Sequence, residues 1–152
     1  TEEGPAYVDN MQRLLRKFET AKSLVPAPVE PNQITPLRVG LLARVMTGAA
    51  MSESLAALEL DGIHLDRMRL RGFPFVDAVA DFITAHDHVF VVEQNRDAQM
   101  KSLMVNECGI DPSRLISILH YDGTPITARF IHERIRSRIG SANVTPIKRV
   151  AA

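Results

Sequence analysis

Apolar residues alternate along the chain between short continuous runs and helically spaced stripes. The clearest run extends from Val89 to Val92 and is followed at once by five polar side chains. A short, fully apolar run is typical of a strand covered on both faces within a parallel sheet. Helical spacing then resumes on one face with Met100, Leu103 and Met104. The segment predicts a strand, a polar loop and a helix, with Asn95 or Asp97 as the helix N-cap.

The same alternation recurs along the body of the chain. Apolar runs predict strands at 38–43, 63–70, 89–92 and 115–119. Helical stripes predict helices over about 49–60, from Pro74 onward, up to about 108, and over about 126–139. Charged residues interrupt the run at 63–70, as expected for a strand nearer a sheet edge. Strands that alternate with helices through short connections predict a three-layer α/β domain, with a mainly parallel sheet of four or five strands.

A helix and a proline-rich segment precede this body. Val8, Met11, Leu15 and Phe18 recur at helical spacing and predict a single apolar stripe over 6–23. Four prolines between Val25 and Pro36 favour extended, semi-rigid backbone. We therefore expect an N-terminal helix (1–24), a linker (25–36), an α/β domain (37–140) and a flexible tail (141–152). The stripe must be buried against the body or against a neighbour.

Composition and charge exclude several functional classes. The 152 residues include 18 basic and 18 acidic side chains, so no excess charge favours nucleic acid or an anionic membrane. No apolar stretch approaches the roughly 20 residues of a membrane span, and we expect a cytoplasmic protein. Cys108, the single cysteine, can form no internal disulfide and cannot hold a zinc or iron–sulfur site alone. The first residue is not Met, which is compatible with a segment of a longer polypeptide or with processing.

Several segments, taken in order, resemble a known family. They are RKFETA (16–21), GIHLDRMRLRGFPF (62–75), VFVVEQNRDAQMKSLMVNE (89–107) and ISILHYDGTPITARFI (116–131). They resemble the carboxyl-terminal part of the alpha subunit of 2-oxoacid:ferredoxin oxidoreductases, nearest to the 2-oxoglutarate type. The most specific features are E-Q-N-x-x-A-Q at 93–99 and the D-G-x-P turn at 122–125. The resemblance implies a fold like the transketolase carboxyl-terminal domain.

The resemblance also implies a function for the complete enzyme. Such an enzyme oxidatively decarboxylates a 2-oxoacid with coenzyme A and passes the electrons to ferredoxin. Thiamine diphosphate, magnesium and the iron–sulfur cluster are held largely by the beta subunit and by another alpha-subunit domain. The segment represented here is expected to shape interfaces with those parts, without catalytic, cofactor-binding or metal-binding residues of its own. It is expected to show no turnover alone.

One turn departs from the family pattern. The family has small residues after the first strand, whereas residues 44–48 of this chain read Arg-Val-Met-Thr-Gly. Small residues at such a turn let a backbone or ligand approach closely. The larger side chains of Arg44, Val45 and Met46 would crowd a ligand at this position.

The polar loop after the third strand is the first candidate site. Glu93, Gln94, Asn95 and Gln99 follow a buried strand, at the edge where open α/β sheets bind ligands. They are expected to line a subunit interface; capping of the next helix and direct ligand contact are the alternatives. Arg96 beside them is read as a surface arginine in preference to an anion-binding one.

Other candidate groups are weighed against structural roles. Asp122 and Gly123 could cradle an anion with backbone N–H groups, but a tight turn with glycine at positive φ is favoured. His86 and His88 form an H-x-H pattern without a visible third metal ligand, so a metal site is disfavoured. Cys108 lies at a predicted helix C-terminus, where the dipole raises a thiol's pKa, and is expected to be unreactive.

Two further interpretations stay open. The chain could be a free-standing α/β module that binds a nucleotide or a CoA-like ligand at the same sheet edge. It could also be the terminal domain of a transketolase-like enzyme that acts without ferredoxin. A glycine-rich turn after the first strand would favour the free-standing binding module. Residues 44–47 of this chain contain no glycine and argue against that module.

Overall fold

A four-stranded parallel sheet forms the centre of the computed structural model, which describes residues 2–29, 39–44 and 47–139. The strands are β1 (Val39–Arg44), β2 (Asp66–Leu70), β3 (His88–Glu93) and β4 (Leu115–Leu119). Their order across the sheet is β2-β1-β3-β4, and every neighbouring pair is parallel. The predicted sheet is confirmed, with four strands.

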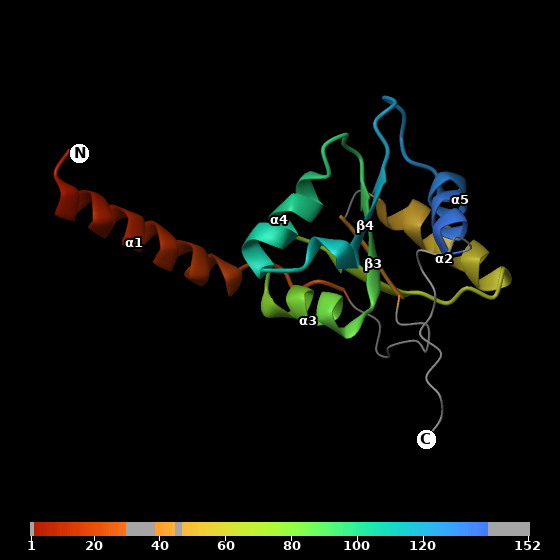
Figure 1. Cartoon of the computed structure of the whole chain (residues 1–152), viewed down its shortest axis with the longest axis horizontal. Helices are drawn as coiled ribbons and strands as arrows, with labels where there is room; N and C mark the ends of the chain where they lie inside the picture. Colours follow the sequence, from red (N-terminus) through yellow and green to blue (C-terminus); the bar gives the residue numbers. More distant parts are fainter. Residues whose placement is uncertain (1, 30–38, 45–46, 140–152) are drawn as a thin grey trace, which may run out of the picture.

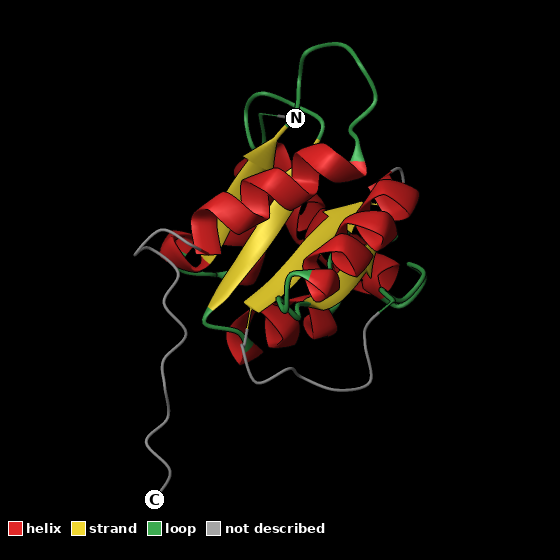
Figure 2. Ribbon diagram, turned by 90° about the vertical axis from the view of Figure 1, so that its right-hand side faces the viewer, coloured by secondary structure: helices red, strands yellow, loops and turns green. Residues whose placement is uncertain are grey.

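Helices cover both faces of the sheet (Figures 1 and 2). The covering helices are α2 (Gly48–Leu60), α3 (Asp77–Ala85), α4 (Gln99–Cys108) and α5 (Ala128–Ile139). Helix α1 (Gly4–Lys22) lies outside these layers, and a short 3-10 helix is formed by Pro112–Arg114. Side chains of α2 and α5 form one apolar layer with the sheet, and those of α3 and α4 form the other. The three-layer α/β class predicted from the sequence is therefore confirmed.

The two central strands are buried on both faces because successive side chains point to opposite sides of a sheet. Leu41 and Phe90 pack in the layer of α2 and α5, whereas Leu42 and Val91 pack in the layer of α3 and α4. All four side chains are fully buried. This two-sided burial explains why these strands appear in the sequence as continuous apolar runs.

Strand β2 lies at the edge of the sheet, as its interrupted apolar pattern predicted. Its outer side is partly covered, since Val29 and Arg69 form an antiparallel bridge with two backbone hydrogen bonds of 2.9 and 3.1 Å. The strand begins at Asp66 and not at Ile63, whose N–H instead donates back to the carbonyl oxygen of Leu58 in α2 at 2.9 Å.

Two details of the predicted helices are wrong. The helix expected to open at Pro74 begins at Asp77, because Val76 is extended and Pro74 and Phe75 are buried in the loop before it. Leu103 was expected on the buried face of α4, but it is 40% exposed while Met100 and Met104 pack inward.

Helix α1 is present as predicted, but none of its residues is buried. It projects away from the body, with its C-terminal end beside α3 and α4 (Figure 1). The linker residues 30–36 and the tail from 140 lie outside the described residues, so the expected domain boundaries remain predictions.

Candidate functional site

Glu93 organises the polar loop at the carboxyl edge of the sheet. It is the last residue of β3 and only 4% exposed. Its carboxylate accepts hydrogen bonds from the backbone N–H groups of Met100 at 2.7 Å and Lys101 at 3.1 Å, and from Nδ2 of Asn95 at 2.8 Å. Because the first N–H groups of a helix have no partner within the helix, this carboxylate caps α4 and complements its dipole.

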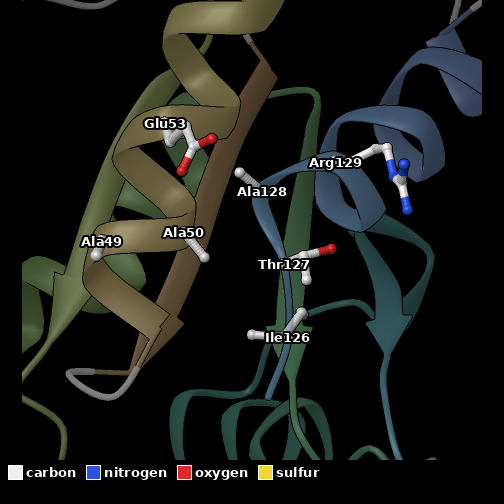
Figure 3. Close-up of a pocket in the computed structure, with 7 residues that line it drawn as sticks. All are labelled: Ala49, Ala50, Glu53, Ile126, Thr127, Ala128 and Arg129. Atoms are coloured by element: carbon white, nitrogen blue, oxygen red, sulfur yellow. The ribbon is translucent and has the colours of Figure 1, made fainter. Parts of the chain in front are cut away.

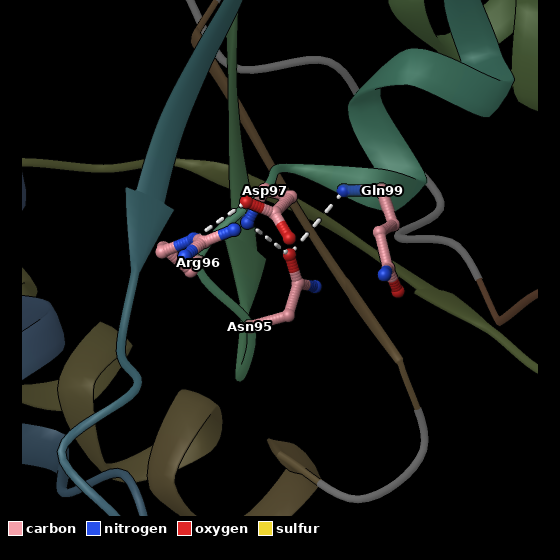
Figure 4. Close-up of polar contacts among 4 residues, drawn as sticks. All are labelled: Asn95, Arg96, Asp97 and Gln99. Carbon is pink, nitrogen blue, oxygen red and sulfur yellow. Dashed lines mark hydrogen bonds and ion pairs between the residues drawn. The ribbon is translucent and has the colours of Figure 1, made fainter.

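Asn95 completes the same turn (Figure 4). Its Oδ1 accepts from the N–H of Asp97 at 3.1 Å and from the N–H of Gln99 at 3.3 Å. The N-cap position itself is held by Ala98, with φ of 50°, so the prediction of Asn95 or Asp97 there is wrong. The loop curls left-handed at Ala98, and the caps reach the helix from residues farther upstream in the chain.

The remaining polar side chains of this loop face solvent. Gln94, Arg96 and Gln99 are exposed, and Nε of Arg96 pairs with Oδ1 of Asp97 at 2.7 Å. An exposed pair of this kind contributes little to stability. Capping thus accounts for Glu93 and Asn95, and an interface or ligand role for the three exposed side chains stays a prediction.

The Asp122–Gly123 segment forms a tight turn. Oδ1 of Asp122 accepts from both the backbone N–H and the hydroxyl of Thr124, each at 2.8 Å, and Gly123 has φ of +87°. These hydrogen bonds hold the pKa of the Asp122 carboxyl below its usual range. The carboxylate occupies the N–H of Thr124 and places a negative charge inside the turn, which disfavours an anion there and favours the turn interpretation.

An open pocket lies between the N-terminal ends of α2 and α5 (Figure 3). Its volume is about 580 Å³, and its lining residues are Ala49, Ala50, Glu53, Ile126, Thr127, Ala128 and Arg129. The N-termini of helices favour anions. Here the Glu53 carboxylate on the wall of the pocket opposes an anionic ligand. The Thr127 hydroxyl already accepts a hydrogen bond from the N–H of Phe130 at 3.2 Å. The sequence analysis did not predict this pocket; its only signal is the small residues at the start of the two helices, Ala49 and Ala50 in α2 and Ala128 in α5.

His86 and His120 are buried and have structural partners. His86 is buried, with Nε2 2.8 Å from Oδ2 of Asp66 and Nδ1 2.6 Å from the carbonyl oxygen of Phe82. His120 is 8% exposed and packs edge-on against the ring of Phe130, with ring centroids 4.8 Å apart. The partnership of His86 with Asp66 was not foreseen, because the two residues are distant in sequence.

Among the residues that the structure describes, no three His, Cys, Asp or Glu side chains converge as they would to hold a metal ion. None of the described helices combines the length and the apolar character of a membrane span.

Cys108 is expected to react slowly with alkylating reagents at neutral pH. Burial is the main cause that raises the pKa of its thiol, ahead of the opposing influence of Lys22 and the smaller one of Glu107. Since only the thiolate reacts, the alkylation rate should rise with pH to a midpoint above the ordinary value of 9.0. Iodoacetamide kinetics against pH measure this, with glutathione as control; a rate equal to that of glutathione at pH 7 would contradict it.

Comparison with known proteins bears on the fold. No protein-family model matches the chain, and no curated protein matches its sequence. The solved structure of 2-oxoglutarate:ferredoxin oxidoreductase from Magnetococcus marinus, with 2-oxoglutarate, coenzyme A and succinyl-CoA bound, superposes over 91% of this chain with a TM-score of 0.77 and 18% identity. A second match is the alpha chain of a probable 2-oxoacid ferredoxin oxidoreductase from Thermoplasma acidophilum. The matched region includes 76% of this chain and 97% of the Thermoplasma chain, at 20% identity and a TM-score of 0.48.

The match to the Magnetococcus protein covers only 24% of that longer chain. At this level of identity the likeness concerns architecture, and the order of strands and helices is what the two share. This chain therefore has the three-layer fold of a segment of that oxidoreductase, consistent with the transketolase carboxyl-terminal type expected from the sequence.

Proposed function

We propose that the chain is the carboxyl-terminal domain of the alpha subunit of a 2-oxoacid:ferredoxin oxidoreductase, with 2-oxoglutarate as substrate of the assembled enzyme. The observation that carries the proposal is the superposition over 91% of the chain on an enzyme of this class. The motifs at 93–99 and 122–125 support it independently, because both fall in the loops that join a strand to the next helix at the carboxyl edge of the sheet.

The contribution of this domain is positional. The buried Glu93 carboxylate fixes the loop between β3 and α4, and Asp122 fixes the turn between β4 and α5. Both loops are thereby held rigid while Gln94, Arg96 and Gln99 stay available to a neighbouring surface. Thiamine diphosphate, magnesium, the iron–sulfur cluster, coenzyme A and ferredoxin would be bound by the remaining alpha-subunit domains and the beta subunit.

Purification from native cells tests this proposal. A tag on the chain should recover a larger alpha subunit and a second subunit, with thiamine diphosphate and iron in the preparation. This material should reduce ferredoxin when given 2-oxoglutarate and coenzyme A, and pyruvate should serve as the comparison substrate. The 152-residue chain alone should show no turnover with either acid.

The alternatives give different results in the same preparation. A thiamine-dependent enzyme without iron would replace the proposal with a transketolase-like one. A chain recovered alone would indicate a free-standing binding module. The specific observation in favour of such a module is the pocket between α2 and α5, and a thermal shift of the isolated chain by nucleotides or coenzyme A would support it.

A further inference from the structure

Strand β4 leaves one edge of the sheet unpaired. It is the last strand in the order β2-β1-β3-β4, and no described strand lies on its outer side. Its sequence, Leu-Ile-Ser-Ile-Leu, contains neither a charged residue nor a proline, the residues that commonly keep edge strands from pairing. The edge formed by β2 differs, because it carries arginines and is bridged by Val29 at Arg69. Of the two edges, β4 is therefore the one open to a further strand.

The direction of the backbone groups alternates along β4. The N–H of His120 donates to the carbonyl oxygen of Glu93 at 2.9 Å, and this register turns the even-numbered residues of β4 toward β3. The odd-numbered residues 115, 117 and 119 therefore direct their N–H and carbonyl groups toward the outer edge.

Only the first of these three residues has partners at the outer edge within the described part of the chain. The N–H of Leu115 donates to the carbonyl oxygen of Pro112, and its own carbonyl oxygen accepts from Nζ of Lys101 at 2.6 Å. No described group bonds to the outward backbone of Ser117 or Leu119, and both residues are partly exposed. Together they present two donors and two acceptors, the pattern that an added strand matches.

Arg134 lies beside this edge on the face covered by α5. One flank of α5 faces α2, since Nε of Arg136 lies 3.5 Å from Oδ2 of Asp61. Two positions apart on a helix, Arg134 and Arg136 point about 200° apart. Arg134 stacks on Phe130, with its guanidinium carbon 5.1 Å from the ring centroid, and Phe130 contacts His120 directly after β4. Arg134 therefore points toward the β4 side of the helix.

Lys101 provides a second basic group, on the face covered by α4. Neither Lys101 nor Arg134 forms an ion pair with another described residue. The acidic residues in the turns before and after β4, Asp111 and Asp122, accept from N–H groups of their own turns at 2.9 and 2.8 Å. The charges alongside the open stretch are thus basic on both faces, which favours an acidic partner.

We propose that an extended, acidic segment of another domain of the oxidoreductase assembly adds to β4 as a further strand. The identity of the assembly rests on the proposed function, whereas the chemistry of the edge rests on β4 and its flanks alone. Side chains alternate between the faces of a strand, so two adjacent acidic residues would meet Arg134 and Lys101 on opposite faces. A second copy of β4 fits less well, because it brings no acidic residue to either face.

Ser117→Pro in the assembled enzyme tests strand addition. The proline removes an outward N–H and no hydrogen bond to β3, so the sheet keeps its existing ladder. We expect the partner domain to be retained roughly tenfold more weakly. Ser117→Ala, which keeps the N–H, should leave retention unchanged. Equal retention of the partner by the two folded variants would overturn the inference.

Photo-cross-linking in native cells gives a readout that does not depend on the folding of the proline variant. Leu119→p-benzoylphenylalanine places the probe on the open edge, and Arg67→p-benzoylphenylalanine places it on β2 at the opposite edge as a control. We expect the Leu119 probe, and not the Arg67 probe, to cross-link to an acidic segment of another oxidoreductase domain. A cross-link to a second copy or to this chain's own residues, or no selective cross-link, would overturn the inference.

Removal of single charges tests the acidic character of the partner. Arg134→Gln should weaken its retention severalfold at low salt, whereas Arg136→Gln, the same change on the opposite flank of α5, should leave it unchanged. Equal effects of these two variants would overturn the acidic assignment. Recovery of the oxidoreductase with Leu119 unlinked would uphold the proposed function and overturn this inference. A selective cross-link to an acidic strand of an unrelated protein would uphold strand addition at β4 and overturn the proposed function.

Discussion

Replacement of His86 with alanine is expected to lower the free energy of unfolding by about 3–5 kcal/mol. The reason is the carboxylate left behind: Asp66 is 2% exposed and lies 2.8 Å from Nε2 of His86. Removal of one partner of a buried pair leaves the other group desolvated without its main counter-group. The substitution also deletes the imidazole packed against the Phe82 ring at a centroid distance of 4.3 Å.

The proton arrangement explains why the site tolerates no simple substitute. The Phe82 carbonyl can only accept, so Nδ1 of His86, 2.6 Å away, must carry a hydrogen. A proton must also lie between Nε2 and the Asp66 carboxyl, because neither a bare nitrogen nor a carboxylate can donate. The guanidinium of Arg114 donates to the His86 carbonyl at 2.9 Å and links this cluster to the start of β4. Loss of the ring therefore removes contacts to β2 and α3, whereas the Arg114 hydrogen bond, made to the backbone of residue 86, is retained.

A second histidine provides the matched control. His132 lies at the same 2.8 Å from a carboxylate, that of Asp61, but the two side chains are 18% and 32% exposed. His132→Ala should therefore cost no more than about 1 kcal/mol. Urea unfolding of both variants measures the difference. Equal losses would contradict the argument that burial, and not distance, determines the worth of these pairs.

The sequence predicted what depends on local periodicity. The apolar run at 89–92 gave β3 with its buried character, and the glycine after Cys108 ends α4 in the left-handed conformation, with φ of 63°. The edge position of β2 followed from the charges that interrupt its apolar run. In each case the property is encoded within a few neighbouring residues, where spacing and backbone preference decide the outcome.

What the sequence could not predict depends on contacts between distant segments. Asp66 looked like a solvent-facing edge residue, yet it points inward and meets His86, twenty positions away. Leu103 matched the apolar stripe of α4, yet it is 40% exposed, because the sheet and neighbouring helices do not reach that side of the helix. At the candidate site, the sequence identified which polar residues form the loop after β3. It could not show which of them cap α4 and which face solvent, because that depends on the Glu93 side chain turning back toward Met100.

The capping role of Glu93 predicts the second large effect on stability. Glu93→Ala should lower the free energy of unfolding by about 2–3 kcal/mol, because it leaves the N–H groups at the start of α4 without their charged acceptor. Glu93→Gln should cost less, since its carbonyl oxygen can still accept from Met100 while its amide nitrogen cannot accept from Lys101. Both losses should occur in the isolated chain, before any partner subunit is added.

Hydrogen exchange of the α4 amides locates the effect. In Glu93→Ala the N–H groups of Met100 and Lys101 should exchange much faster, and the far end of the helix should follow only through its reduced stability. Glu107→Ala is the control: it removes an exposed carboxylate near the C-terminus of the same helix, where the dipole disfavours negative charge, and should be neutral or slightly stabilising. Unchanged protection of Met100 in Glu93→Ala would refute the capping role. Glu93 would then be free for the contact with a neighbouring subunit or ligand that its position at the sheet edge first suggested.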